Sequence, residues 1–531
     1  MLSGIEGIPE TGTPEHARWL LAYLLDFHRR EDKAAWWKYY ALRDSTDDEL
    51  LDESEAVAGL EFRARVDVVR RKKGGTPTGS VIDRYSYPPQ EMEIRRKAEL
   101  RNRDESKFGE VVAVDRVALT IDVKKGPSQA EQHPTAVFSH KYVSPGALEA
   151  AIAAVGESVA TAPGLDGANA IARALLLREP PRLASGSFAS PANAGASTFA
   201  IDVVSRLDRA VLPIQGPPGS GKTYTGARMI CALVAQGKRV GVMGPSHKAI
   251  INLLKAVTEA AASAQQMVKV AHKKDDDEDL PAPIAQIAKE DEGLRALADG
   301  TINVLGGTAW LWARADMAYA VDVLFVDEAG QVSLANAVAV SAAAESMVLL
   351  GDPQQLDQPQ KGAHPDGVDA SVLAHLLGEH ETIPRDRGIF LSETWRLSPA
   401  ICAFTSQVFY ESRLAPRPGL EHQVLAGIDG LSGSGLWYVD VEHDGRTSAS
   451  DEEVSVVAEL FATLTTPGSS WVSDKGVTAK IGVDDILVVS PFNARVSRLV
   501  DRLPAGARVG TVDRFQGQAA PVVIYSMATS R

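Results

Sequence analysis

One glycine-rich octapeptide restricts the fold of this chain more than any other feature. Residues 216–223 match the pattern G-x-x-x-x-G-K-[ST], which chance would produce in roughly one or two per cent of chains of this length. An apolar stretch (211–214) precedes the match and a helical pattern (224–235) follows it. Backbone N–H groups and a helix N-terminus would then surround a phosphate. The alternative is a turn without ligand. We predict a site for ATP, made by Gly216, Pro217, Pro218, Gly219, Ser220, Gly221, Lys222, Thr223 and Tyr224.

Two acidic residues follow another apolar stretch, 323–326, about a hundred residues later. A carboxylate at the end of a neighbouring strand can hold Mg²⁺ through its water shell, and a second can deprotonate the attacking water. We therefore assign Asp327 to the metal together with the Thr223 hydroxyl, and Glu328 to the general base. For an isolated acidic pair, a plain helix N-cap is the commoner interpretation.

Further candidates for the same site come later in the chain. Gln355 follows the apolar stretch 347–350, where an uncharged amide can sense the γ-phosphate. In 393–396, the ring of Trp395 can stack on adenine, and Arg396 can stabilise charge on the transferred phosphoryl group from across a cleft. An isolated Trp-Arg pair is usually structural, so this role depends on the whole set. The predicted catalytic residues are Lys222, Glu328, Gln355 and Arg396.

Short apolar runs alternate with helical patterns after Ser197, as expected for buried parallel strands. A first series comprises 211–214, 240–243, 302–305, 323–326 and 347–350. A second comprises 389–391, 486–489, 509–512 and 522–525. The predicted fold class is α/β, with two doubly wound domains in tandem. The acidic run 275–279 is interpreted as a solvated loop of the first domain.

The first 180 residues have different periodicities. Residues 1–55 show helical spacing, whereas 60–68 and 117–123 alternate with period two. The alternating segments predict a small antiparallel β-module such as a barrel. Helical spacing returns at 146–180 and is followed by a Gly/Ser/Pro-rich linker at 185–197.

The composition excludes several classes of protein. The net charge is −14, which argues against a uniformly basic nucleic-acid coat protein, so nucleic acid would need a locally basic channel. The two cysteines are far apart and provide neither a disulfide framework nor a metal cluster, so nucleotide-bound Mg²⁺ is the only metal we expect. We see no secretory signal and no bilayer-spanning stretch, and therefore expect a cytoplasmic protein without a membrane partner.

An ordered set of motifs resembles superfamily 1 helicases. The motifs are GPPGSGKT (216–223), PSHKAI (245–250), GGTAW (306–310), VDEAGQ (326–331), GDPQQL (351–356), TWRLSP (394–399), SPFNARV (490–496) and GTVDRFQGQ (510–518). The resemblance is closest to the branch of nonsense-mediated-decay and Okazaki-processing helicases. Within that branch it is closest to bacterial proteins in which the helicase follows a RecB-like nuclease. It is strong over 200–531 and looser over 15–145.

The resemblance implies five segments: a helical segment (1–55), a β-barrel accessory domain (56–145), a helical stalk and linker (146–197), a RecA-like domain 1 (198–380) and a RecA-like domain 2 (381–531). It also implies ATP between the RecA-like domains and 5′-to-3′ movement on single-stranded nucleic acid, with a nuclease domain on the same polypeptide. The basic arm Arg63, Arg65 and 70–73 could grip the strand or be an exposed hairpin tip. By motif position, the strand would be contacted by Ser246, His247, Lys248, Gly307, Thr308, Asn493 and Thr511. Trp310 could stack a base or belong to the core.

Several positions depart from the family pattern. No adenine-reading glutamine is evident among 197–201, Arg495 replaces a common glutamine, and Ala519 replaces a common glutamate. The final arginine-bearing motif, expected after 522–525, is missing, and no nuclease signature is evident. Losing such an arginine costs roughly 10³- to 10⁵-fold in phosphoryl transfer. We hypothesise that domain 2 is truncated and that the chain binds ATP better than it hydrolyses it.

Three functions remain open on the sequence. The first is an ATP-driven helicase or translocase, with DNA favoured over RNA because of the nuclease association. The second is an ATP-gated clamp that holds a single strand for a nuclease. The third, an unrelated P-loop enzyme such as a small-molecule kinase, predicts no second α/β domain. The motifs at 394–399 and 490–518 therefore argue against it.

Overall fold

The structure is a computed structural model. It describes residues 7–51, 53–70, 76–90, 92–140, 142–162, 165, 168–190, 195–274, 280–356, 360–445, 450–515 and 517–527. The acidic run 275–279 and the basic residues Arg71, Lys72 and Lys73 lie outside these ranges. Within them, none of the helices is long and apolar enough to pass through a bilayer.

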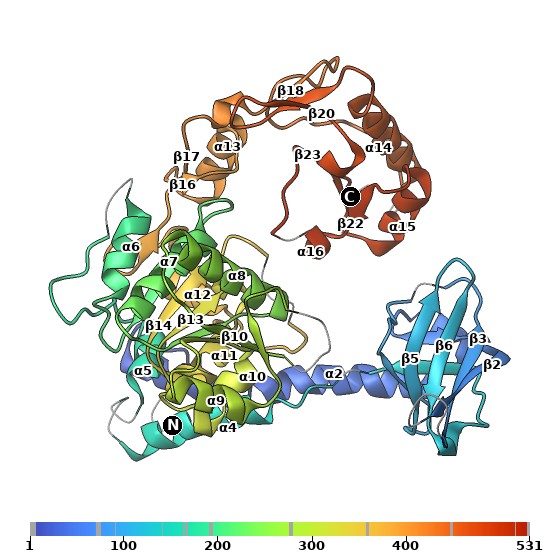
Figure 1. Ribbon diagram of the computed structural model, residues 1–531, viewed down its shortest axis with the longest axis horizontal. Coiled ribbons are helices and arrows are strands. Elements are labelled where there is room, and N and C mark those ends of the chain that lie inside the picture. The colour runs from blue at the N-terminus through green and yellow to red at the C-terminus, as the bar shows by residue number, and fades with distance from the viewer. Residues whose placement is uncertain are drawn as a thin grey trace.

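An eight-stranded parallel sheet forms the core of the first domain (Figure 1). The spatial order is β11-β10-β12-β9-β13-β14-β8-β15. The predicted runs 211–214, 240–243, 323–326 and 347–350 all lie within its strands, which confirms the α/β class. The strands are β8 (Val211–Gln215), β9 (Val240–Met243), β10 (Val270–Lys273), β11 (Ala285–Ile287), β12 (Val304–Gly306), β13 (Val321–Asp327), β14 (Ala344–Gly351) and β15 (Ile389–Phe390).

Both faces of this sheet are buried by helices. Along β13, Val323 and Phe325 belong to one apolar cluster, whereas Leu324 and Val326 belong to the other. This burial on both sides explains why the strands are continuously apolar. The first cluster includes α6 (Ala196–Val204), α7 (Lys222–Ala235) and α8 (His247–Ser263). The second includes α1 (Pro14–Leu24), α4 (Gly146–Thr161), α5 (Ala170–Leu177), α9 (Glu290–Ala298), α10 (Ala309–Trp312), α11 (Leu334–Ala339) and α12 (Val372–Leu377).

One strand lies in a different sheet from the one predicted. We expected 389–391 to belong to the second α/β domain, but β15 pairs in parallel with β8, with Ile389 opposite Ile214 and Phe390 opposite Gln215. The assignment of this run to the second sheet is therefore wrong. A three-residue apolar run shows that a strand is buried but does not identify its neighbour.

The helix that links the first domain to the N-terminal sheet is α2 (Phe27–Asp44), as Figure 1 shows. We expected this stalk within 146–197. However, α4 and α5 of that segment pack into the core of the first domain beside α1 and α11. The C-terminal half of α2 instead places Tyr39 and Leu42 against Phe138 in the N-terminal sheet.

The N-terminal sheet, called the β-domain below, has seven antiparallel strands in the order β1-β7-β4-β5-β6-β3-β2. Among the described residues no strand pairing joins β1 to β2, so the predicted antiparallel β-barrel has the form of a half-barrel. Its core includes Tyr85, Phe108 and Ile121. The strands are β1 (Ala56–Ala58), β2 (Glu61–Arg70), β3 (Pro77–Ser86), β4 (Glu99–Arg101), β5 (Lys107–Asp115), β6 (Thr120–Lys125) and β7 (Ala136–Ser139).

The C-terminal region has its own core around Phe461, Ile486 and Leu499. Its parallel sheet has the order β22-β21-β23, and β21 (Ile486–Val489) and β23 (Val522–Tyr525) coincide with predicted runs. In Figure 1, α13 (Pro399–Phe409) lies between this region and the first domain. The other elements are β22 (Arg508–Gly510), α14 (Asp451–Leu464), α15 (Asn493–Arg502) and a small antiparallel sheet of β18 (Val424–Ala426), β19 (Ser470–Val472) and β20 (Thr478–Lys480).

Candidate nucleotide-binding site

The glycine-rich octapeptide connects β8 to α7, as the sequence predicts. Gly219 and Gly221 have φ values of +73° and +82°, a backbone region in which glycine is much preferred. A β-carbon at Gly216 would lie 2.2 Å from Cγ of Lys222, so a side chain at that position would displace the lysine. The glycines therefore allow the chain to wrap tightly around the lysine and to begin α7 at Lys222.

Polar groups converge inside this loop. The Lys222 ammonium donates to the carbonyl oxygen of Gly216 at 2.6 Å, and the buried Ser220 hydroxyl has no hydrogen-bond partner among the described residues. The first N–H groups of a helix also lack partners within the helix. A lysine, an unpaired buried hydroxyl and a helix start suit a polyphosphate. The loop therefore fits the triphosphate of ATP.

The two predicted carboxylates lie at the end of β13. Asp327 is only 5% exposed, and burial raises its pKa to about 7, helped by the Glu328 charge and opposed by the Glu328 N–H and by Lys222. A carboxylate in such a position gains most from a cation, so Asp327 and the Thr223 hydroxyl suit Mg²⁺. Glu328 follows with φ +52° and ψ 43°, a strained conformation for a residue with a side chain.

The turns after β13 and β14 touch each other. A β-carbon at Gly330 would lie 2.4 Å from the carbonyl oxygen of Asp352, and the Gly216 N–H donates to the Gly351 carbonyl at 2.9 Å. The structure thus brings together the P-loop, the acidic turn and the turn that bears Gln355. The amide of Gln355 donates to Oδ2 of Asp352 at 3.1 Å. Its role as a phosphate sensor stays a prediction.

Arg396 lies directly against the P-loop. The Trp395 N–H donates to the Gly219 carbonyl at 2.9 Å, and a β-carbon at Gly219 would lie 2.4 Å from Cβ of Arg396. The Trp395 ring is 55% exposed and carries the Arg417 guanidinium 3.6 Å from its centroid. Tyr224 is similarly exposed, with Arg228 at 3.5 Å. One face of the Trp395 ring, the candidate for adenine stacking, and one face of the Tyr224 ring are therefore each covered by an arginine.

The residues predicted to contact nucleic acid fall into two groups. In the first domain, Ser246 caps α8 by accepting from the Ala249 N–H at 3.2 Å, and Lys248 is exposed. His247 lies 2.9 Å from His272, between Nδ1 and Nε2. Gly307 and Thr308 precede α10, at the C-terminal ends of β12 and its neighbour β9.

Trp310 is neither fully buried nor free. It is 39% exposed, and its indole N–H donates to the Ser144 carbonyl at 2.9 Å. The buried tryptophan of this segment is Trp312, which donates to the carbonyls of Val242 and Gly307. The core alternative considered for Trp310 thus applies to its neighbour two residues later.

The second group lies in the C-terminal region. Asn493 begins α15, but its side chain lies outside the described part of the chain; Thr511 precedes α16 (Val512–Phe515). Figure 1 shows both helices in the C-terminal region, with α16 on the side of that region that faces α8. Asn493 and Thr511 therefore belong to a different region of the structure from Ser246 and Thr308.

Arg495, which replaces a common glutamine, has a structural role. Its side chain is fully buried, and its guanidinium donates to Glu453 at 3.0 Å and to the Ser526 hydroxyl at 2.7 Å. These contacts tie α14, α15 and the end of β23 together. Burial lowers the pKa of Arg495 even though the nearby Glu453 charge opposes the shift.

The described part of the basic arm is largely neutralised. Arg63 pairs with Glu61 at 2.6 Å, and Arg65 pairs with Asp83 at 2.9 Å and Glu131 at 3.1 Å. Neutralised arginines attract a phosphate backbone less than free ones. The choice between a nucleic-acid grip and an exposed hairpin tip stays a prediction.

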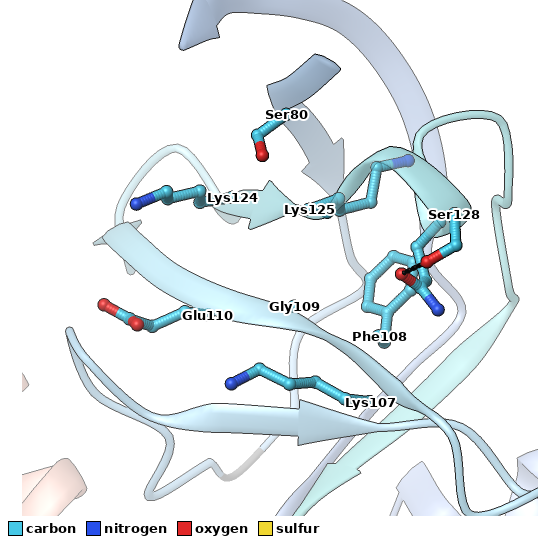
Figure 2. A pocket seen from close by; sticks show the side chains of 10 residues that line it. Ser80, Lys107, Phe108, Gly109, Glu110, Lys124, Lys125 and Ser128 are labelled. Atoms are coloured by element: carbon cyan, nitrogen blue, oxygen red, sulfur yellow. Dashed lines mark hydrogen bonds between the residues drawn. The ribbon is translucent and has the colours of Figure 1, made fainter. Parts of the chain in front are cut away.

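A hollow of about 470 Å³ lies on the β-domain and is lined by both charge signs (Figure 2). Lys107, Glu110 and Lys124 point to one side in this view, whereas Lys125 points to the other. Lys107 pairs with Glu99 at 2.6 Å, and Lys125 pairs with the buried Asp83 at 2.8 Å. None of the residues predicted for the nucleotide site lines this hollow, and the candidate chemistry lies in the first domain.

Sequence reasoning missed two residues that organise the site. Thr394 is fully buried and donates to the Pro218 carbonyl at 3.0 Å, while Tyr410 donates to Asp352 at 2.6 Å. Thr394 belongs to the TWRLSP motif and could have been selected by its position beside Arg396. Tyr410 lies outside every motif, and its sequence context gives no signal.

Comparison with known proteins identifies the two α/β regions. A family model described as an AAA domain matches residues 198–380, and a second AAA-domain model matches residues 368–531. These matches support two tandem nucleotide-binding-type regions and leave the N-terminal 197 residues unassigned. The exact domain boundaries stay predictions.

Several curated helicases are similar to this chain. The Schizosaccharomyces pombe "DNA polymerase alpha-associated DNA helicase A" is 23% identical over 380 residues, covering 60% of this chain and 56% of the relative. The Arabidopsis thaliana "DNA replication ATP-dependent helicase/nuclease JHS1" is 22% identical over 396 residues, covering 66% of this chain and 28% of the relative. The Rattus norvegicus "DNA-binding protein SMUBP-2" is 23% identical over 426 residues, covering 66% of this chain and 40% of the relative. The chain thus spans about a quarter to just over half the length of these relatives. It matches two AAA-domain models in tandem and is distantly similar to curated DNA helicases and to a helicase/nuclease.

Proposed function

We propose that this chain is an ATP-dependent motor, a helicase or translocase that moves along single-stranded DNA. The observation that carries the proposal is the contact between 394–396 and the P-loop, because it places an arginine from the start of the second AAA match beside the phosphate site. A nucleotide bound there would lie where both AAA regions can respond to it.

Each residue of the site has a proposed task. Lys222 would exchange its bond to the Gly216 carbonyl for the β- and γ-phosphates, and Thr223 with Asp327 would hold Mg²⁺. Glu328 would orient and deprotonate the attacking water, and Gln355 would respond to loss of the γ-phosphate. Arg396 would stabilise charge on the transferred phosphoryl group.

The strand would contact the first domain through Ser246, Lys248, Gly307 and Thr308, which follow β9 and β12. The C-terminal ends of parallel strands are the usual binding edge of such a sheet. Asn493 and Thr511 would complete the path from the C-terminal region. These contacts would be to the backbone or by stacking, and would not read sequence.

The names of the relatives support DNA as the substrate, since they describe DNA helicases, a helicase/nuclease and a DNA-binding protein. We further propose 5′-to-3′ movement and cooperation with a RecB-like nuclease on the same polypeptide, both inferred from the motif resemblance.

Steady-state ATP hydrolysis tests the proposal directly. Single-stranded DNA should raise the rate above its basal value, matched RNA should raise it less, and Lys222→Ala should abolish both rates. A rate that neither nucleic acid changes would contradict the motor. Strand displacement from forked substrates with a 5′ or a 3′ tail then measures polarity.

The second candidate is an ATP-gated clamp for a nuclease. The paired arginines of the β-domain favour it over efficient unwinding. ATP-dependent DNA affinity without strand displacement would identify the clamp.

A further inference from the structure

The Thr394 hydroxyl makes three hydrogen bonds at the edge of the P-loop. It donates to the Pro218 carbonyl at 3.0 Å and accepts from the backbone N–H groups of Arg396 at 3.2 Å and Leu397 at 3.3 Å. A hydroxyl has one donor and two acceptor positions, so this one is fully used. The side chain thereby shapes the turn that presents Arg396 and attaches this turn to the P-loop.

The backbone of the same turn is held from both sides. On one side, the Trp395 N–H donates to the Gly219 carbonyl at 2.9 Å. On the other, the Arg417 N–H donates to the Thr394 carbonyl at 3.0 Å, where β16 (Glu393–Thr394) pairs with β17 (Ala415–Pro416). Thr394 thus joins the P-loop to segments of the second AAA match.

The Arg396 side chain has no such support of its own. It is exposed, and its guanidinium makes no hydrogen bond or ion pair within the described residues. Its β-carbon is nevertheless packed against Gly219, where an added β-carbon would lie 2.4 Å away. The position of the guanidinium is therefore set by the backbone that Thr394 holds.

We infer that Thr394 is a positioning residue for phosphoryl transfer, which fixes Arg396 beside the P-loop. The inference rests on the proposed ATPase activity and deepens it. Thr394 acts through Arg396 and the Pro218 carbonyl and need not touch ATP. Its removal should slow turnover more than it weakens nucleotide binding.

Thr394→Val tests this inference, because valine keeps the shape of threonine but cannot make the three hydrogen bonds. A small misplacement of a catalytic group costs up to about 10²-fold, so we expect kcat for ATP to fall about 10- to 100-fold. The Kd for a fluorescent ADP analogue should change by less than about threefold, since Lys222 and the loop amides remain. Thr394→Ser, which restores the hydroxyl, should recover most of the lost kcat.

Two controls separate positioning from damage to the fold. Thr382→Val removes another buried hydroxyl, one that bonds to Glu411 and Arg413, and should leave kcat near the wild-type value. In a double-mutant cycle, Thr394→Val should add little to Arg396→Ala, because both changes remove the same contribution.

Each result has a definite meaning. An unchanged kcat in Thr394→Val, no recovery in Thr394→Ser, additive losses with Arg396→Ala, or a parallel rise in the ADP-analogue Kd would each overturn the positioning role. If the wild type hydrolyses ATP but does not respond to DNA, the proposed motor fails while the variant comparison still applies to the basal rate. A wild type without any ATPase activity would overturn both.

Discussion

Tyr410 donates a hydrogen bond of 2.6 Å from its hydroxyl to Oδ2 of Asp352, and thereby joins the end of α13 to the turn after β14. The same carboxylate oxygen accepts from the amide of Gln355 at 3.1 Å. Burial raises the pKa of the Tyr410 phenol, and the Asp352 charge raises it further, so the proton stays on the tyrosine. The candidate phosphate sensor and the end of α13, a helix of the second AAA match, thus share one carboxylate.

Replacing Tyr410 with phenylalanine should weaken this junction. The change leaves the nearly buried Asp352 with one donor fewer, which costs about 1–3 kcal/mol for a buried charged partner. We expect a lower thermal midpoint and a reduced response of ATP hydrolysis to DNA. Tyr438→Phe is the matched control, because that ring is 87% exposed. Equal effects of the two substitutions would show that the Asp352 contact is not responsible.

Replacing Glu328 with glutamine should separate binding from turnover. Glutamine keeps the shape of the side chain but cannot take a proton, and general-base catalysis contributes about 10²- to 10⁴-fold. We expect kcat to fall within this range while the Kd for ATP stays near the wild-type value. Glu345→Gln is the exposed control on β14. A fully active Glu328→Gln would remove Glu328 from the proposed mechanism.

The sequence predicted the local features of the site better than its connections. The runs 240–243 and 486–489 coincide with β9 and β21, because burial on both faces demands continuous apolar residues. The run 522–525 coincides with β23, although Val523 and Tyr525 of that strand are exposed. The P-loop and the acidic turn were also placed correctly relative to their strands. In contrast, the neighbour of β15 depends on contacts between distant segments, which the three apolar residues do not encode.

Tertiary hydrogen bonds account for the residues that were missed. Thr394 acquires its role from the Pro218 carbonyl, and Tyr410 from Asp352; in both cases the partner lies in another segment of the chain. The sequence likewise shows that Trp395 is aromatic, but it does not show that Arg417 covers the ring. Side-chain type indicates what a residue can bind, whereas the fold decides what it meets.

Glu31 of α2 should stabilise the segment that follows the Gln355 turn. Its carboxylate accepts from the Lys361 and Gly362 N–H groups, both at 3.0 Å, and from Nε2 of His364 at 2.6 Å. Burial alone would raise the pKa of Glu31, but these donors hold it below its usual value. Glu31→Ala should therefore speed hydrogen exchange at the amides of 361 and 362.

Hydrogen exchange measured by mass spectrometry or NMR can resolve this effect. Loss of a hydrogen bond to a charged acceptor costs about 1.5–3 kcal/mol, which corresponds to roughly 10- to 150-fold faster exchange if opening is local. Glu15→Ala, at an exposed position of α1, is the control and should leave exchange at 361–362 unchanged. Unchanged exchange in Glu31→Ala would show that the segment is held by other contacts, such as Phe27 stacked on His364.

Buried histidines should make the first domain sensitive to mild acid. Burial lowers the pKa of His375 to about 3, with the Arg178 charge adding to the shift, and its Nε2 lies 2.9 Å from the Leu175 carbonyl. In the unfolded chain a histidine has a pKa of about 6.5, so the unfolded state takes up the proton first. The stability present above pH 6.5 is therefore lost as the pH falls toward 3, at about 1.4 kcal/mol per pH unit for this one group.

The variant His375→Gln keeps a side-chain donor for Leu175 but cannot titrate. Urea unfolding should be measured between pH 7.5 and 5. The transition to follow is the one that ATP moves to higher urea, because a ligand stabilises the domain that binds it, here the first domain. Above the pKa of the unfolded state, the free energies of unfolding of wild type and variant should depend on pH in the same way. Below it the wild type should lose stability faster, by about 1.4 kcal/mol for each pH unit. Parallel curves over the whole range would mean that His375 takes up its proton equally in the folded and unfolded states.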